Sequence, residues 1–200
     1  LNVFKEADAS MNSQKKKEYI DDLRKETIIH QELRHDYIVS YYNDFYIENE
    51  EKLIIEMELC DSSLSAVIED ISLDQALIWF AQICSAVSYL HEPDEIKRKP
   101  EILHRDLKPG NILLKDRKVK VCDFGGAKLI TQTRQSRSKT SKENFYGTQE
   151  YLAPEIFSLD SKRFTKATDI WALGVIFFRM INKGKHPLLY DLNEMNMNYD

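Results

Sequence analysis

Two apolar segments of helical length dominate the hydrophobic pattern of this chain. In the first, Ser72 and Gln75 form a capping-box pattern that opens an apolar helix running through Leu90. In the second, residues 168–180 are apolar nearly all round, which is typical of a helix buried inside a domain. Both runs are shorter than a membrane span, so we expect helices of a core and no membrane segment.

Shorter apolar runs, bounded by polar or turn-forming residues, predict β-strands. Two of them flank the acidic turn at residues 48–51, and two others flank the charged turn at residues 115–118, so each pair predicts a hairpin. The predicted strands are residues 1–7, 38–45, 53–59, 112–114 and 119–122.

Another helix is predicted over residues 15–33, because five positions at steps of four, three, four and three share one face. These positions are Tyr19, Leu23, Glu26, His30 and Leu33. A carboxylate on an inward face needs a cation, since an unpaired buried charge is costly, and Lys5 is the candidate partner of Glu26. The alternative is a solvated Lys5 and a Glu26 on the helix surface. We interpret His30 as a core histidine whose hydrogen bonds are satisfied.

Composition narrows the class of protein. The 200 residues are 42% hydrophobic, enough for a real core in one or two domains. A formal net charge of -5 argues against general binding to nucleic acids or membrane surfaces, because both are polyanions. The cysteines lie far apart, without the spacing of disulfide frameworks or zinc sites, so we expect a reducing, intracellular and cytoplasmic location. They are Cys60, Cys84 and Cys122.

The candidate chemistry lies in residues 104–111, which read His-Arg-Asp-Leu-Lys-Pro-Gly-Asn. This stretch places a carboxylate at Asp106, an ammonium at Lys108 and an amide at Asn111 within one short turn. In this order, the three groups can serve as a proton acceptor, a phosphate-binding cation and a metal ligand. The combination predicts phosphoryl transfer.

Further motifs follow in a fixed order. Residues 123–125 read Asp-Phe-Gly and begin twelve positions after Asn111, and residues 147–155 read Gly-Thr-Gln-Glu-Tyr-Leu-Ala-Pro-Glu. Residues 169–174, Asp-Ile-Trp-Ala-Leu-Gly, open the second apolar helix. With residues 104–111, this ordered series resembles the eukaryotic protein kinases.

The resemblance implies roles for the polar residues. Asp106 would accept the proton of a substrate hydroxyl, and Lys108 would bind phosphate. Thr148 would bridge Asp106 and Lys108. Asn111 and Asp123 would hold Mg²⁺, which accepts two hard oxygen ligands together with water or phosphate oxygens.

The resemblance also implies an ATP site. Lys5, at the end of the first strand, would hold the α and β phosphates and pair with Glu26. Met57 would be the gatekeeper residue, and residues 58–60 would be the hinge, in which the main chain of Glu58 and Cys60 would meet the adenine edge. Leu113 would lie under the adenine ring, although a plain core leucine has the same pattern. Cys122 could be a reactive thiol in the same site or a small buried residue.

Residues 126–146 combine hydroxyl and basic side chains, which favours a mobile loop and resembles an activation segment. Arg105 would bind a phosphate group attached to a hydroxyl residue of that loop. The candidate phosphorylation sites are Thr131, Thr133, Ser136, Ser138, Thr140 and Ser141.

Thr148 and Lys108 match the serine/threonine branch of the family. By the same resemblance Asp169 would brace the catalytic loop, residues 104–111, and a simple helix-capping acid is the alternative.

We therefore expect an α+β, two-lobed, protein-kinase-like fold, with residues 1–59 in the N-lobe and residues 60–200 in the C-lobe. The family's glycine-rich loop does not precede Lys5, and the later C-lobe helices are missing, so the chain resembles a domain truncated at both ends that alone would be inactive or unstable. Residues 92–102 are predicted to be a surface insertion. The expected function is an ATP-dependent serine/threonine protein kinase acting on protein hydroxyls; the alternative is a pseudokinase or regulatory module without catalysis.

Overall fold

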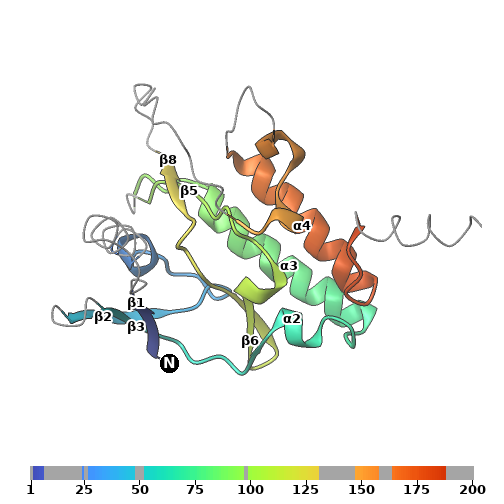
Figure 1. Ribbon diagram of the computed structural model, residues 1–200, viewed down its shortest axis with the longest axis horizontal. Coiled ribbons are helices and arrows are strands. Elements are labelled where there is room, and N and C mark those ends of the chain that lie inside the picture. Colours follow the sequence, from blue (N-terminus) through green and yellow to red (C-terminus); the bar gives the residue numbers. More distant parts are fainter. Residues whose placement is uncertain are drawn as a thin grey trace, which may run out of the picture.

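The computed structural model describes residues 2–6, 24, 27–47, 52–96, 99–130, 147–157 and 164–187. A small antiparallel sheet lies on one side of the molecule, and two long helices lie side by side on the other (Figure 1). Residues 104–130, which carry the predicted chemistry, follow the short strand β5 (Glu101–Leu103), which comes after the first long helix. The expected α+β, kinase-like architecture is confirmed.

The small sheet contains β1 (Asn2–Glu6), β2 (Tyr41–Ile47) and β3 (Lys52–Met57), in the order β1-β3-β2. Both neighbours of β3 are antiparallel to it. The hairpin that we predicted is therefore present, but β2 begins at Tyr41 rather than at residue 38. Ile38 instead forms an isolated bridge to Val121, which joins this part of the chain to the strand Lys118–Val121.

A second, three-stranded sheet has the order β4-β6-β7 and contains the predicted hairpin. β6 (Ile112–Lys115) and β7 (Lys118–Val121) pair with each other, and β4 (Ser62–Ser63) pairs with β6. A third, two-stranded sheet joins β5 (Glu101–Leu103) to β8 (Lys128–Ile130). Thus β8 lies within residues 126–146, where we predicted a loop, and residues 131–146 lie outside the described residues.

The long helices are α3 (Leu73–His91) and α4 (Lys166–Ile181), which pack against each other (Figure 1). Ser72 caps α3 as predicted, because its side chain accepts a hydrogen bond from the main-chain N–H of Gln75. The short helical pieces are α2 (Leu64–Val67) and 3-10 helices at Pro109–Asn111, Gln149–Tyr151 and Pro154–Phe157. Among the described residues, no helix has the length and apolar character to cross a membrane.

The main core lies between α3, α4 and the β6–β7 hairpin. Ile83, Leu90, Ile112, Val121 and Ile176 are fully or almost fully buried in it. The prediction that residues 168–180 are buried all round was wrong on one side. Ile170 and Trp171 remain exposed, whereas the opposite side of α4 packs on α3.

The predicted helix over residues 15–33 is described only at its end, where helical structure stops at Gln31. His30 and Leu33 are buried, as expected for an inward face. Residues 7–23 and Glu26 lie outside the described residues. The boundary between residues 59 and 60 stays a prediction.

Candidate active site

The centre of the site is Asp106, which follows β5 and precedes the 3-10 helix Pro109–Asn111. Its carboxylate accepts hydrogen bonds from the Lys108 ammonium at 2.8 Å and from the Asn111 amide at 3.1 Å. The main-chain N–H of Thr148 also donates to it at 2.9 Å and the Thr148 hydroxyl at 3.1 Å. These bonds fix the carboxylate in one orientation, as a positioned proton acceptor requires.

Thr148 connects two distant parts of the chain. Its hydroxyl accepts a hydrogen bond from the Lys108 ammonium at 2.9 Å while it donates to Asp106. The bridge expected between Lys108 and Asp106 is therefore present. It requires glycine at 147: this residue has φ of 102°, and a Cβ there would lie 2.8 Å from the carbonyl oxygen of Arg105.

Asn111 is 7% exposed, and its amide nitrogen donates to the main-chain oxygen of Asp106 at 2.8 Å as well as to the carboxylate. The nitrogen is thus committed to the catalytic loop, which leaves the amide oxygen as the ligand atom. Asp123 supplies a carboxylate from the end of the β6–β7 hairpin. An amide oxygen and a carboxylate are hard ligands, so the residues present fit Mg²⁺.

Phe124 holds Asp123 in place. Its ring is 1% exposed and lies between two histidine rings, with its centroid 4.9 Å from that of His30 and 5.4 Å from that of His104. His30 also forms a hydrogen bond of 2.7 Å with the main-chain oxygen of Val39, which confirms a satisfied core histidine. Asp123 itself has a positive φ of 67°, a conformation that its packed neighbour helps to maintain.

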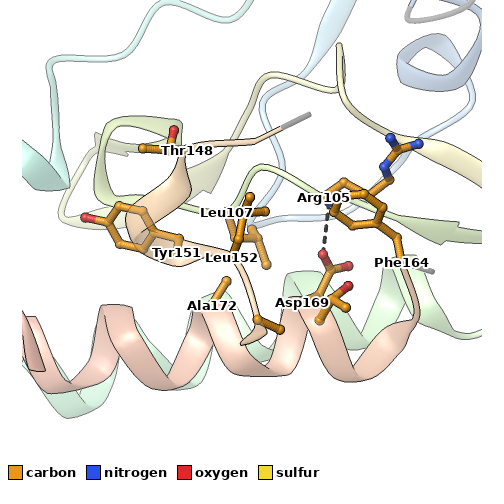
Figure 2. Close-up of a pocket in the computed structure, with 10 residues that line it drawn as sticks. Arg105, Leu107, Thr148, Tyr151, Leu152, Phe164, Asp169 and Ala172 are labelled. Carbon is orange, nitrogen blue, oxygen red and sulfur yellow. Dashed lines mark hydrogen bonds between the residues drawn. The ribbon is translucent and has the colours of Figure 1, made fainter. Parts of the chain in front are cut away.

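Asp169, in the first turn of α4, braces the start of the catalytic loop. Its carboxylate accepts hydrogen bonds from the main-chain N–H groups of His104 and Arg105, both at 2.9 Å, and lies 2.8 Å from the imidazole of His91. Figure 2 shows the bond from Arg105 above α4. Asp169 is 1% exposed, so hydrogen bonds with the protein take the place of those that its carboxylate would form with water. Of the two roles considered for Asp169, the structure confirms the bracing role.

The segment 147–157 docks on α4 beside the catalytic loop and leaves a cavity of about 10 Å³ between them (Figure 2). Arg179 of α4 donates to the Tyr151 hydroxyl, and His186 forms a 2.8 Å hydrogen bond with the main-chain oxygen of Glu150. The guanidinium of Arg105 lies over the Phe164 ring, 4.4 Å from its centroid. The hydroxyl residues proposed to receive phosphate near Arg105 lie outside the described residues.

The nucleotide positions are only partly described. Met57 ends β3 and packs on the buried pair Leu53 and Ile55. The main-chain N–H of Asp61 donates to Leu114 at 2.8 Å, so the chain after Cys60 runs beside Leu113, which is half-buried in β6. For Lys5 only the main chain in β1 is described, and Glu26 lies outside the described residues. The Lys5–Glu26 pair therefore stays a prediction.

Glu58 has a structural role that the sequence did not reveal. Its carboxylate is 3.0 Å from the ammonium groups of both Lys115 and Lys120 and accepts a hydrogen bond from the Ser40 N–H at 3.1 Å. Burial raises the pKa of Glu58, but the Ser40 N–H and the two lysines outweigh it and lower the pKa from 4.5 to about 2. The side chain thus ties the predicted hinge to β6 and β7. Its main-chain N–H donates to the main-chain oxygen of Ser40 at 2.9 Å, and its main-chain oxygen lies 4.0 Å from the Cys60 sulfur.

Because the pKa of Glu58 is lower in the folded state, its stabilisation is complete above pH 4.5 and disappears as the pH falls toward 2. Glu58→Gln should therefore reduce the free energy of unfolding at pH 7 by about 2 kcal/mol, and the difference from wild type should shrink at pH 3. Urea unfolding at both pH values measures this. Glu32→Gln, at an exposed glutamate, is the control, and an equal deficit at both pH values would contradict the prediction.

Two further contacts were not foreseen. His91 and Asp169 are 78 residues apart, so only the tertiary structure brings them together. The prediction that residues 92–102 form a surface insertion was wrong for Lys99 and Ile102, which are 8% and 2% exposed. A run of charges and prolines is typical of a solvated loop, and the sequence does not indicate which lysine is buried.

Two cysteines lie near the predicted nucleotide positions. Cys122 is buried, and its thiol lies against the main-chain oxygen of Asn111. Burial raises the pKa of the Cys60 thiol, and the charge of Glu58 adds to this effect.

Comparison with known proteins gives the same assignment as the geometry. Residues 3–199 match the family model described as protein kinase domain. The chain belongs to the protein kinase family. In this kinase domain, Asp106 and Asn111 occupy the catalytic loop, and residues 123–125 supply the Asp-Phe-Gly motif.

Curated relatives of this kinase domain carry serine/threonine-protein kinase names. It is 32% identical to TOUSLED of Arabidopsis thaliana over 192 residues, which are 93% of this chain and 27% of that protein. It is 39% identical to PKH2 of Saccharomyces cerevisiae over 160 residues, 75% of this chain and 14% of that protein. It is 36% identical to human Nek10 over 180 residues, 86% of this chain and 14% of that protein. The kinase domain thus spans 14% to 27% of the length of these relatives.

Proposed function

We propose that this kinase domain transfers the γ-phosphate of ATP to serine or threonine hydroxyls of protein substrates. The observation that carries the proposal is the fixed orientation of Asp106, whose carboxylate is held by Lys108, Asn111 and Thr148. A carboxylate held in this way can orient a substrate hydroxyl and accept its proton. The names of the relatives support the choice of serine and threonine.

In this proposal the nucleotide lies between Met57, the main chain of Glu58 and Cys60, and Leu113. Lys5, paired with Glu26, would bind the α and β phosphates. Lys108 would bind the transferred phosphoryl group, because its ammonium is held 2.8 Å from the carboxylate of Asp106, the proposed proton acceptor. The amide oxygen of Asn111 and the carboxylate of Asp123 would hold Mg²⁺, whose charge would neutralise that of the phosphates.

A pseudokinase that binds partners without catalysis is the alternative. It would not need a proton acceptor with a single orientation, and Asp106, Lys108, Asn111 and Asp123 are all present.

The three free cysteines, Cys60, Cys84 and Cys122, suit a reducing compartment, which supports the proposed intracellular location.

The test is phosphotransfer from radiolabelled ATP to a basic protein substrate by the full-length gene product, with and without Mg²⁺. Activity should require Mg²⁺, and Asp123→Asn should lower it at least about 100-fold, since an amide replaces the charged metal ligand. Asp70→Asn, at an exposed aspartate, is the matched control. Nucleotide binding by a wild-type protein that transfers no phosphate would support the pseudokinase instead.

A further inference from the structure

A buried lysine, Lys99, closes the carboxyl end of α3. Its ammonium donates hydrogen bonds to the main-chain oxygens of Leu90 at 3.2 Å and Pro100 at 3.3 Å, and to that of Glu92. It also lies 4.9 Å from the centroid of the Tyr89 ring. Lys99 is 8% exposed, although it belongs to a segment rich in charged residues.

The physical reason for this placement is the unpaired end of the helix. The last carbonyls of an α-helix have no partner within it, and the negative end of its dipole attracts a cation. An ammonium has three donors, and here three carbonyl oxygens accept them. Burial lowers the pKa of Lys99, so these contacts must offset a cost of desolvation.

Lys99 lies two residues before β5, the strand that leads into the catalytic loop. The main-chain groups of Lys99 and Asp94 exchange two hydrogen bonds of 2.9 Å, which hold these two residues side by side. Within β5, Glu101 forms an ion pair of 3.2 Å with Lys166 at the start of α4. The strand therefore begins at an anchor on α3, and the side chain of its first residue is tied to the start of α4.

The exit of β5 is anchored separately. The strand ends at Leu103, and the next two residues, His104 and Arg105, donate their main-chain N–H groups to Asp169. His91, the last residue of α3, contacts the same carboxylate. The carboxyl end of α3 thus contacts both anchors: Leu90 binds Lys99 at the entrance, and His91 binds Asp169 at the exit.

We infer that Lys99 is a positioning residue for the catalytic loop: its ammonium fixes the entrance of β5 on α3, and this anchor, together with Asp169 at the exit, sets the position of Asp106. The kinetic consequence rests on the proposed phosphotransfer function, whereas the structural part does not. A shift of the loop by a fraction of an ångström would move Asp106 relative to the substrate hydroxyl without disturbing the residues that bind adenine.

The first experiment uses the wild-type full-length protein and needs no catalysis. Lysines are acetylated with the N-hydroxysuccinimide ester of acetic acid, and the rate at each lysine is followed by mass spectrometry. Lys99 should react at least about tenfold more slowly than Lys118, an exposed lysine in β7, because a bonded, buried amine is shielded from the reagent. Equal rates at the two lysines would overturn the inference.

The second experiment compares Lys99→Met, which keeps the stem and loses the cation, with Lys99→Arg, which keeps the cation. Hydrogen exchange at the His104 and Arg105 amides should accelerate in Lys99→Met and return toward the wild-type rate in Lys99→Arg. The kcat of Lys99→Met should fall about tenfold with the KM for ATP within about twofold of wild type. Lys118→Met is the control for both measurements and should match wild type.

Wild-type exchange and kcat in Lys99→Met, or a Lys99→Arg variant no better than Lys99→Met, would overturn the positioning role. If Lys99→Met does not fold, acetylation of the wild type and exchange in Lys99→Arg decide the question: slow acetylation and near-wild-type exchange support the inference, and any other result overturns it. Absence of phosphotransfer in the wild type would refute the proposed function alone, because acetylation and exchange still test Lys99.

Discussion

Asp106→Asn is expected to reduce phosphotransfer by about 100- to 10,000-fold, the range that a positioned general base contributes. An amide cannot accept the proton of the substrate hydroxyl. Its NH₂ group would also face donors that now bind the carboxylate, the Lys108 ammonium and the Thr148 hydroxyl among them. The measurement is kcat with saturating ATP and Mg²⁺, together with the dissociation constant of ATP.

The loss should appear in kcat, because the hydrogen bonds described for the Asp106 carboxylate come from Lys108, Asn111 and Thr148, and none of these three is proposed to bind adenine. Asp116→Asn is the matched control: Asp116 is an exposed aspartate in the turn between β6 and β7, and asparagine tolerates its positive φ of 48°. Asp116→Asn should leave kcat within twofold of wild type. An Asp106→Asn enzyme that retains a tenth or more of wild-type kcat would show that Asp106 is not the proton acceptor.

Short sequence patterns predicted the elements whose stabilising contacts join residues close together in the sequence. Ser72 and Gln75 marked the start of α3 because a helix cap needs only residues three apart. The two apolar runs that flank residues 115–118 predicted the β6–β7 hairpin, since its strands are joined by a short turn. The bridge between Thr148 and Lys108 was foreseen only through the resemblance to kinases, because forty residues separate the two positions.

The contacts that escaped prediction join residues with no local signal. The sequence predicted a role only for the main chain of Glu58, in the hinge. Its carboxylate nevertheless binds lysines on two strands far along the sequence. Lys99 is one of several charges in its segment, and only the position of the α3 terminus singles it out. A sequence pattern identifies which residues are polar, whereas the partners of buried polar groups depend on how distant elements pack.

Asp169→Ala is expected to lower the free energy of unfolding by about 3–5 kcal/mol, the typical effect of removing one partner from a buried charged network. The change leaves the N–H groups of His104 and Arg105 without their acceptor and removes the contact of His91. It also releases Arg105, whose φ of 70° is unfavourable for a residue with a side chain and is held in place by Asp169. Urea unfolding at pH 7 gives the free energy.

Asp74→Ala separates this bracing effect from the general preference of helix starts for acids. Asp74 also lies in the first turn of a long helix, α3, but it is exposed. Its removal should therefore cost no more than about 1 kcal/mol, the value of an acid near the positive end of the helix dipole. Equal losses in the two variants would mean that Asp169 acts only through its own helix. A loss confined to Asp169→Ala, accompanied by fast exchange of the His104 and Arg105 amides, is the result that bracing requires, because those two amides lie outside α4 and in the catalytic loop.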